Sequence, residues 1–179
     1  MELIMNNEKL KNLVHYICHK VKDPSKLGLT KLNKVLYYSD FLFYLQNYKP
    51  ITEETYIKKD HGPVSKNLTR ILKELQTEGK VFEREQAVID FTRHELVSVK
   101  RPDISAFEPE EIALIDEIIE IISNNYTAQS IGDLTHDEVW EVAQNGEEIP
   151  YHAILGKEST PSQKAVKWAE SVIEAKHYA

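Results

Sequence analysis

The sequence predicts an α+β fold that is predominantly α-helical, a helical domain with a small antiparallel β-sheet or hairpin. Most of the chain shows apolar residues at helical spacing, and strand-like patterns are confined to residues 55–60 and 80–100. The chain has 179 residues and shows no internal repeat, low-complexity tract or long linker. A chain of this length can bury a core without disulfide or metal support. We therefore expect residues 1–179 to form a single domain.

Amphipathic spacing defines the expected helices. In the second helix, apolar or aromatic side chains occur on nearly every side, which is typical of a helix in the middle of a fold. Thr30 is its expected N-cap and Pro50 follows its end. Pro109 is expected in the first turn of the fourth helix. The expected helices cover about residues 8–21, 31–48, 63–78, 109–126, 127–135, 136–144 and 161–176.

A His-Gly-Pro corner follows the expected strand at residues 55–60. Gly62 can adopt backbone angles closed to other residues, and Pro63 suits the first turn of a helix, so we expect a strand-to-helix corner. His61 would then lie beside a helix N-terminus, where an anion or another ligand could bind. The alternative is a sharp turn with His61 packed against the sheet. A hairpin of two strands is expected after Gly79, between residues 80 and 100.

Charge and composition restrict the class of protein. The net charge is −7, but residues 1–84 carry 15 basic and 10 acidic residues, or +5, and residues 85–179 carry 7 and 19, or −12. The two halves could therefore form unlike surfaces, one of which would suit a basic partner. No apolar run approaches the roughly 20 residues of a transmembrane helix, and the start lacks the pattern of a secretory signal. We expect a cytoplasmic protein without membrane association, and the single cysteine, Cys18, excludes an intrachain disulfide.

Two groups of residues could carry chemistry. His15, Cys18 and His19 share one helical face, but no fourth zinc ligand follows at a recognisable spacing, so we expect no metal and no cofactor. Asp40 lies in an aromatic helix and needs a partner, for which His61, His136 or a lysine are candidates. A polar network that fixes the core is favoured over catalysis, because no adjacent nucleophile or glycine-rich phosphate loop accompanies it. We therefore expect no enzyme activity and no catalytic residue.

The segment from Lys31 to Leu72 resembles the Panacea (SocA-like) antitoxin domain family. That family shows a K-L-x-K-L-L-Y-x-x-D helix, an aromatic-containing strand and a G-P-V corner. Asn33-Lys34-Val35 departs from the more apolar step expected there. The matching residues here are Lys31, Leu32, Lys34, Leu36, Tyr37, Asp40, Pro50, Ile51, Thr52, Tyr56, Gly62, Pro63 and Val64.

A weaker second block of the resemblance contains His136 and Trp140, which lie one helical turn apart. We interpret them as a packed support beneath the sheet, with a ligand-pocket role as the alternative. Whether Asp40, His61 and His136 form a pocket or only a core network stays open at this point.

The resemblance implies a non-enzymatic antitoxin of a toxin-antitoxin system, of the kind found in phage defence or on mobile elements. Such a domain binds and neutralises a toxin encoded beside it, sometimes by delivering it to a protease. A protease or chaperone and a second copy of the chain are further possible partners. We expect no appended DNA-binding domain, and therefore do not expect autoregulation.

An interface with a toxin should bury roughly 1,200–2,000 Å² and contain a few aromatic anchors. Tyrosines near element ends and the acidic side of the fourth helix are the candidates for partner binding: Tyr48, Tyr126 and Tyr151, and Glu110, Glu111 and Glu117.

The alternative function is a DNA-binding regulator, because a helix at 63–78 followed by a hairpin is also how a winged helix-turn-helix ends. Its phosphate contacts would come from Lys66, Arg70, Lys73, Lys80 and Arg84. The expected recognition helix lacks residues that read base edges well, so nucleic acid is not the expected partner.

Overall fold

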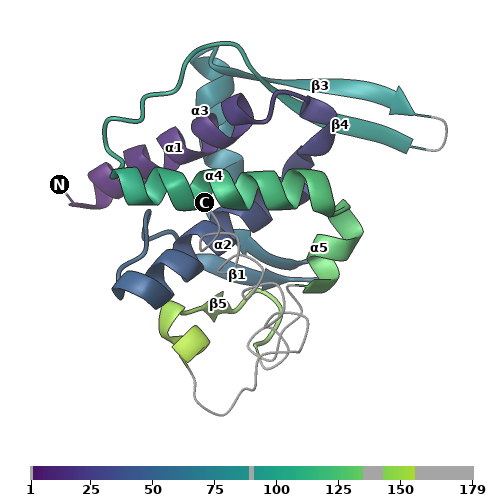
Figure 1. Ribbon diagram of the computed structural model, residues 1–179. Coiled ribbons are helices and arrows are strands. Elements are labelled where there is room, and N and C mark those ends of the chain that lie inside the picture. Colours follow the sequence, from purple (N-terminus) through teal and green to yellow (C-terminus); the bar gives the residue numbers. More distant parts are fainter. Residues whose placement is uncertain (1, 89–90, 135–142, 156–179) are drawn as a thin grey trace, which may run out of the picture.

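The computed structural model describes residues 2–88, 91–134 and 143–155. It confirms a helix-rich α+β fold with two small antiparallel sheets (Figure 1). The helices are α1 (Glu2–Lys20), α2 (Gly28–Asn47), α3 (Leu68–Thr77), α4 (Pro109–Asn125) and α5 (Ala128–Leu134), with short 3-10 turns η1 (Pro24–Lys26) and η2 (Tyr151–Leu155). The strands are β1 (Tyr56–Lys59), β2 (Gly62–Ser65), β3 (Val81–Val88), β4 (Phe91–Ser98) and β5 (Glu148–Ile149).

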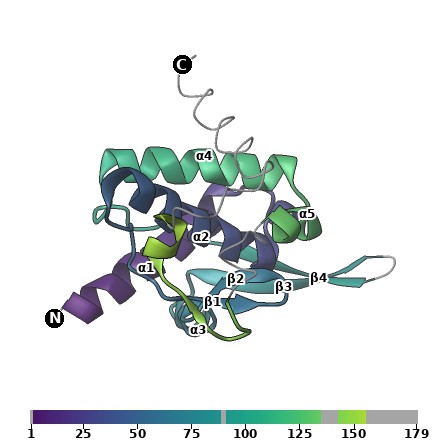
Figure 2. The ribbon, with the colours of Figure 1, turned by 90° about the horizontal axis from the view of Figure 1, so that it is seen from below.

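Helix α2 is the centre of the fold. It contacts α1, α4 and α5 as well as β2, β4 and η2, and Figure 2 shows it between α4 and the strands. Its side chains are buried on several sides, as the nearly all-round apolar pattern predicts. The buried residues of α2 are Lys31, Leu32, Lys34, Val35, Leu36, Tyr37, Ser39, Asp40 and Phe41.

The start of α2 differs from the prediction. The helix begins at Gly28, whose φ of +67° is a left-handed conformation that glycine adopts at little cost. Leu27 occupies the N-cap position and makes no side-chain capping bond, so Thr30 lies inside the helix rather than at its cap. The preceding 3-10 turn, capped by Asp23, leads the chain directly into α2.

The His-Gly-Pro corner is a β-hairpin turn, so the predicted strand-to-helix corner is wrong. β1 pairs with β2 in antiparallel register from Tyr56↔Ser65 to Lys59↔Gly62, and α3 begins only at Leu68. Pro63 is accommodated because β2 is the edge of the sheet, whose order is β2-β1-β5. Gly62 has a φ of +91°, which explains the glycine at the turn.

The second sheet is the predicted hairpin after Gly79. β3 and β4 pair over eight residues each, from Val81↔Ser98 to Val88↔Phe91. Figures 1 and 2 both show this hairpin reaching beyond the helical body of the molecule. Val81 and Leu96 at its base are buried, whereas Phe82 to Ala87 are exposed, so only the base of the hairpin belongs to the core.

Helix α4 covers one side of the core and begins as predicted. Pro109 is its first residue, and Glu108 and Glu111 form a reciprocal capping box around that first turn. The side chains of Leu114, Ile115 and Ile118 face the core. None of the helices within the described residues is long and apolar enough to cross a membrane. The helix predicted at 161–176 and most of that predicted at 136–144 lie outside the described residues.

Candidate functional site

The two lysines of the family-like motif are both buried in α2. Lys34 is 1% exposed, and its Nζ donates a hydrogen bond of 3.1 Å to the carbonyl oxygen of Pro63. Burial lowers the pKa of Lys34 to about 7. The Nζ of Lys31 donates to the Ser123 carbonyl at 3.2 Å, in the last turn of α4, where helix carbonyls lack intrahelical partners. These lysines therefore fasten β2 and the end of α4 to α2.

Asn33, which lies between the two lysines, also forms a hydrogen bond with β2. Its Oδ1 accepts a hydrogen bond of 2.9 Å from the backbone N–H of Ser65 in β2. Asn33 and Lys34 thus place two polar side chains against the same strand. His61 itself is exposed at the turn, so the predicted position beside a helix N-terminus is wrong, and with it the anion site built on that position.

Asp40 is the centre of a buried polar network. Its Oδ1 accepts the backbone N–H of Thr52 at 2.7 Å, and its Oδ2 accepts the hydroxyls of Thr52 at 2.6 Å and Tyr56 at 2.8 Å. The hydroxyl of Tyr151 lies 3.4 Å from the same oxygen and donates more closely, at 2.6 Å, to the carbonyl of Glu54. The carboxylate thus ties α2 to the segment after it, to β1 and to η2.

Burial raises the pKa of Asp40 to about 6, although the hydrogen bonds from Thr52 and Tyr56 act in the opposite direction. The prediction that Asp40 pairs with His61 or a lysine is wrong, because these hydroxyl and amide groups surround it instead. His136, the third predicted partner, lies outside the described residues, as does Trp140.

Aromatic rings enclose this network. Tyr56 meets the rings of Tyr37 and Phe41 edge-on at centroid distances of 5.4 and 5.7 Å. Tyr151 lies 4.7 Å from Phe41 and 5.6 Å from Tyr44. The family-like residues Leu32, Leu36, Tyr37, Asp40 and Tyr56 are all buried. The motif therefore builds the interior of the domain and presents none of these side chains to a partner.

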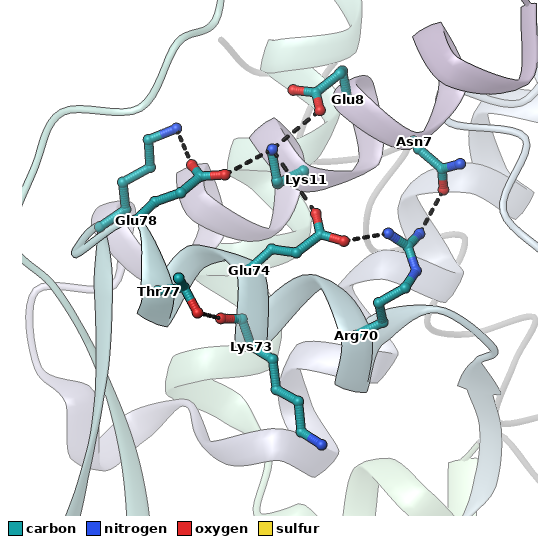
Figure 3. Close-up of polar contacts among 9 residues, drawn as sticks. Asn7, Glu8, Lys11, Arg70, Lys73, Glu74, Thr77 and Glu78 are labelled. Atoms are coloured by element: carbon teal, nitrogen blue, oxygen red, sulfur yellow. Dashed lines mark hydrogen bonds and ion pairs between the residues drawn. The ribbon is translucent and has the colours of Figure 1, made fainter.

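The outer face of α3 carries an ion-pair network with α1, shown in Figure 3. The Nζ of Lys11 lies 3.0 Å from both Glu8 and Glu78 and 3.9 Å from Glu74. Arg70 pairs with Glu74 and donates to the side-chain oxygen of Asn7 at 2.8 Å. Lys11 is 8% exposed, so its charge needs these carboxylates. The network fastens α1 onto α3.

An open groove of about 610 Å³ runs over this face of α3. Its lining combines three cations with two carboxylates, so the groove has little net charge. Figure 3 shows the side chain of Lys73 turned away from the ion-pair network. The lining residues are Lys66, Thr69, Arg70, Lys73, Glu74, Thr77 and Glu78.

The cations that would contact DNA phosphates are mostly paired with carboxylates. Lys66 pairs with Glu148 at 2.9 Å, Lys80 with Glu78 at 2.6 Å, and Arg70 and Arg84 pair with Glu74 and Glu95. Binding a phosphate would require these pairs to exchange partners. This arrangement gives no support to the winged-helix alternative, although a helix followed by a hairpin is present.

The predicted partner-binding residues fall into exposed and buried groups. Tyr48 is 74% exposed at the C-terminal cap of α2, whereas Tyr126 and Tyr151 are half-buried, and the hydroxyl of Tyr151 points into the protein. Glu110 is exposed and Glu117 half-buried. Glu111 is 5% exposed and pairs with Lys9 at 2.7 Å in addition to capping α4, so it does not belong to a solvated acidic face.

The residues considered for zinc point to different partners. His15 is buried with its Nε2 3.0 Å from the Lys100 carbonyl, and His19 Nδ1 lies 3.3 Å from the hydroxyl of Ser98. Burial raises the pKa of the Cys18 thiol to about 12 and so disfavours the thiolate that binds metal. Across residues 2–88, 91–134 and 143–155, no three His, Cys, Asp or Glu side chains are grouped to hold a metal ion.

The family-like motif thus faces inward in an α-rich scaffold and contributes to its packing. The family model for the Antitoxin SocA-like, Panacea domain matches residues 32–141, which is more than half of the chain. The chain belongs to the SocA-like Panacea antitoxin domain family. No curated protein and no solved structure matches it.

Proposed function

We propose that this protein is the antitoxin of a toxin-antitoxin pair and neutralises its cognate toxin by direct binding, without catalysis. The observation that carries the proposal is the family match over residues 32–141. Its motif residues support the proposal because they are used inside the domain, where Asp40 and Lys34 hold elements together rather than face a substrate. The residues that recognise the toxin would then lie on the outer surface of the protein.

Tyr48 supports this reading as a surface anchor. It is 74% exposed, its backbone has a φ of +55°, and its N–H donates a hydrogen bond of 2.8 Å to the Tyr44 carbonyl. An exposed aromatic ring on a rigid backbone can be buried in an interface at a small cost in conformational entropy. The exposed acid Glu110 and the half-buried Glu117 on α4 could meet a basic toxin surface.

The test is co-expression with the product of the neighbouring reading frame. We expect that product alone to stop growth, and we expect this protein to restore growth and to co-purify with it. If growth is restored while the toxin disappears from the cell, a host that lacks its major cytoplasmic proteases separates occlusion from delivery to a protease. A neighbour that is harmless, or one that stays toxic in the presence of this protein, would overturn the proposal.

A further inference from the structure

The outer edge of β3 is open. Within the described part of the chain, β3 pairs only with β4, while β4 in turn packs against α1, α2 and η1. Every residue from Phe82 to Ala87 is exposed, so neither face of this part of β3 is covered by described residues. It contains no proline or bulge, two of the features that protect edge strands from further pairing.

The register shows which backbone groups face outward. The N–H of Val99 donates to the Lys80 carbonyl at 3.0 Å, so Lys80 and every second residue after it, including Arg84 and Gln86, are the positions bonded to β4. The intervening residues direct their N–H and C=O groups away from β4. In the exposed part of the strand these are Glu83, Glu85 and Ala87.

The side chains at this edge favour one sign of charge on a partner strand. Glu83 and Glu85 project from the same face of β3, because they are two residues apart. The carboxylate of Glu83 lies 2.8 Å from His94 Nδ1. The side chain of Glu85 is exposed, at the strand position opposite His94. A strand added here would place its side chains beside two carboxylates, which favours Lys or Arg at those positions.

A second copy of this chain is a poor occupant of the edge. The antiparallel registers that give two β3 strands the longest overlap through their outward positions set Glu83 opposite Glu85 of the other copy, or Glu85 opposite itself. A register that sets Glu85 opposite Ala87 avoids this, but it shortens the overlap. Like charges directly opposite each other destabilise a sheet. The charge pattern therefore opposes self-pairing and favours a different, basic chain.

We propose that the β3 edge binds an extended basic segment of the toxin as an added antiparallel strand. This inference rests on the proposed function and names the part of the surface that performs it. Backbone hydrogen bonds to Glu83, Glu85 and Ala87 would supply affinity, and the two carboxylates would supply selectivity for basic side chains. Phe82, 51% exposed at the start of the edge, offers an apolar contact.

Amide hydrogen exchange tests the added strand directly. The probe is a peptide with the sequence TKVKVKT, and the control is its acidic counterpart TEVEVET. We expect the basic peptide to protect the amides of Glu83, Glu85 and Ala87 while those of Arg84 and Gln86 change little. Absence of protection at these three amides at saturating peptide would overturn the inference, even if the protein neutralises a toxin.

Charge reversal provides the second test, on the complex with the neighbouring gene product. The double variant Glu83→Lys with Glu85→Lys should weaken that complex by about tenfold or more, because two attractive cross-strand pairs become repulsive. The matched control, Asp103→Lys with Asp133→Lys, makes the same change of charge at two exposed positions, one in the loop before α4 and one in α5. Equal weakening by both pairs, or by neither, would overturn the inference while leaving the proposed function intact.

A third variant, Glu85→Pro, removes one outward N–H and leaves the bonds to β4 in place. It should weaken the complex and abolish protection by the peptide, with the β3–β4 amides still protected. If the neighbour is harmless and nothing co-purifies, the proposed function fails, and the peptide experiment still decides whether the edge accepts a basic strand.

Discussion

The carboxylate of Asp40 on α2 accepts a hydrogen bond of 2.8 Å from the hydroxyl of Tyr56 on β1, and both side chains are buried. Sixteen residues separate them along the chain. Together with Thr52, they join the central helix to the first strand. The polar network around Asp40 is therefore a structural feature whose loss should be measurable as a loss of stability.

Replacing Asp40 by alanine should destabilise the protein by about 3 kcal/mol or more, because the Thr52 N–H and the Tyr56 hydroxyl would be buried without an acceptor. Asp40→Asn keeps the size of the side chain and one acceptor oxygen, so it should cost less. Urea unfolding of the three proteins measures the difference. Equal stability of native protein and Asp40→Ala would contradict a structural role for the carboxylate.

The stability contributed by Asp40 should fall as pH rises from about 4 to about 6. Its pKa is raised from 3.8 to about 6 in the folded protein, so in this range the folded state binds more protons than the unfolded state. Relative to Asp40→Asn, the native protein should lose on the order of 2–3 kcal/mol over this range. Unfolding both proteins at several pH values checks this. A difference between them that is independent of pH would refute it.

Lys34 should show the opposite dependence at higher pH. Its pKa is lowered from 10.5 to about 7, so between these values the unfolded state binds more protons and stability rises with pH. We expect Lys34→Met to be at least as stable as the native protein at pH 7, since it no longer buries an amine. That advantage should shrink toward pH 10. A constant difference in unfolding free energy between pH 7 and pH 10 would argue against a depressed pKa.

A substitution at Tyr48 should change stability and toxin binding in opposite directions. Its left-handed backbone suits glycine, so Tyr48→Gly should stabilise the cap of α2 by about 0.5–1 kcal/mol. If the ring is an anchor for the toxin, the same variant should bind the neighbouring gene product more weakly despite its greater stability. Thermal unfolding and a titration of the partner measure the two effects. Unchanged affinity would remove Tyr48 from the interface.

Local signals were sufficient for much of the fold. The all-round apolar pattern of α2 predicted its central position, and Gly79 and Pro109 marked the end of α3 and the start of α4. The corner at Gly62 and Pro63 was misassigned because both residues are common at turns and at helix starts. Only pairing with β1, which is invisible in the sequence pattern, makes residues 62–65 an edge strand.

The partners of Asp40 could not be derived from spacing either. Charged groups were the obvious candidates, but the fold instead brings Thr52, Tyr56 and Tyr151 to the carboxylate. Tyr151 arrives there because β5, a strand of only two residues, pairs with β1 across a long separation in sequence. No local pattern identifies so short a strand. The appearance of Thr52 and Tyr56 in the same family-like motif as Asp40 was the one available signal.

Neutralisation by direct binding is tested most directly with the two purified proteins. This protein is mixed with the product of the neighbouring reading frame, and the masses of the species in the mixture are determined by size-exclusion chromatography with light scattering. We expect a stable complex whose mass is the sum of whole numbers of both chains, together with loss of toxicity. Two separate species, with the neighbour still toxic in cells that contain this protein, would contradict neutralisation by direct binding.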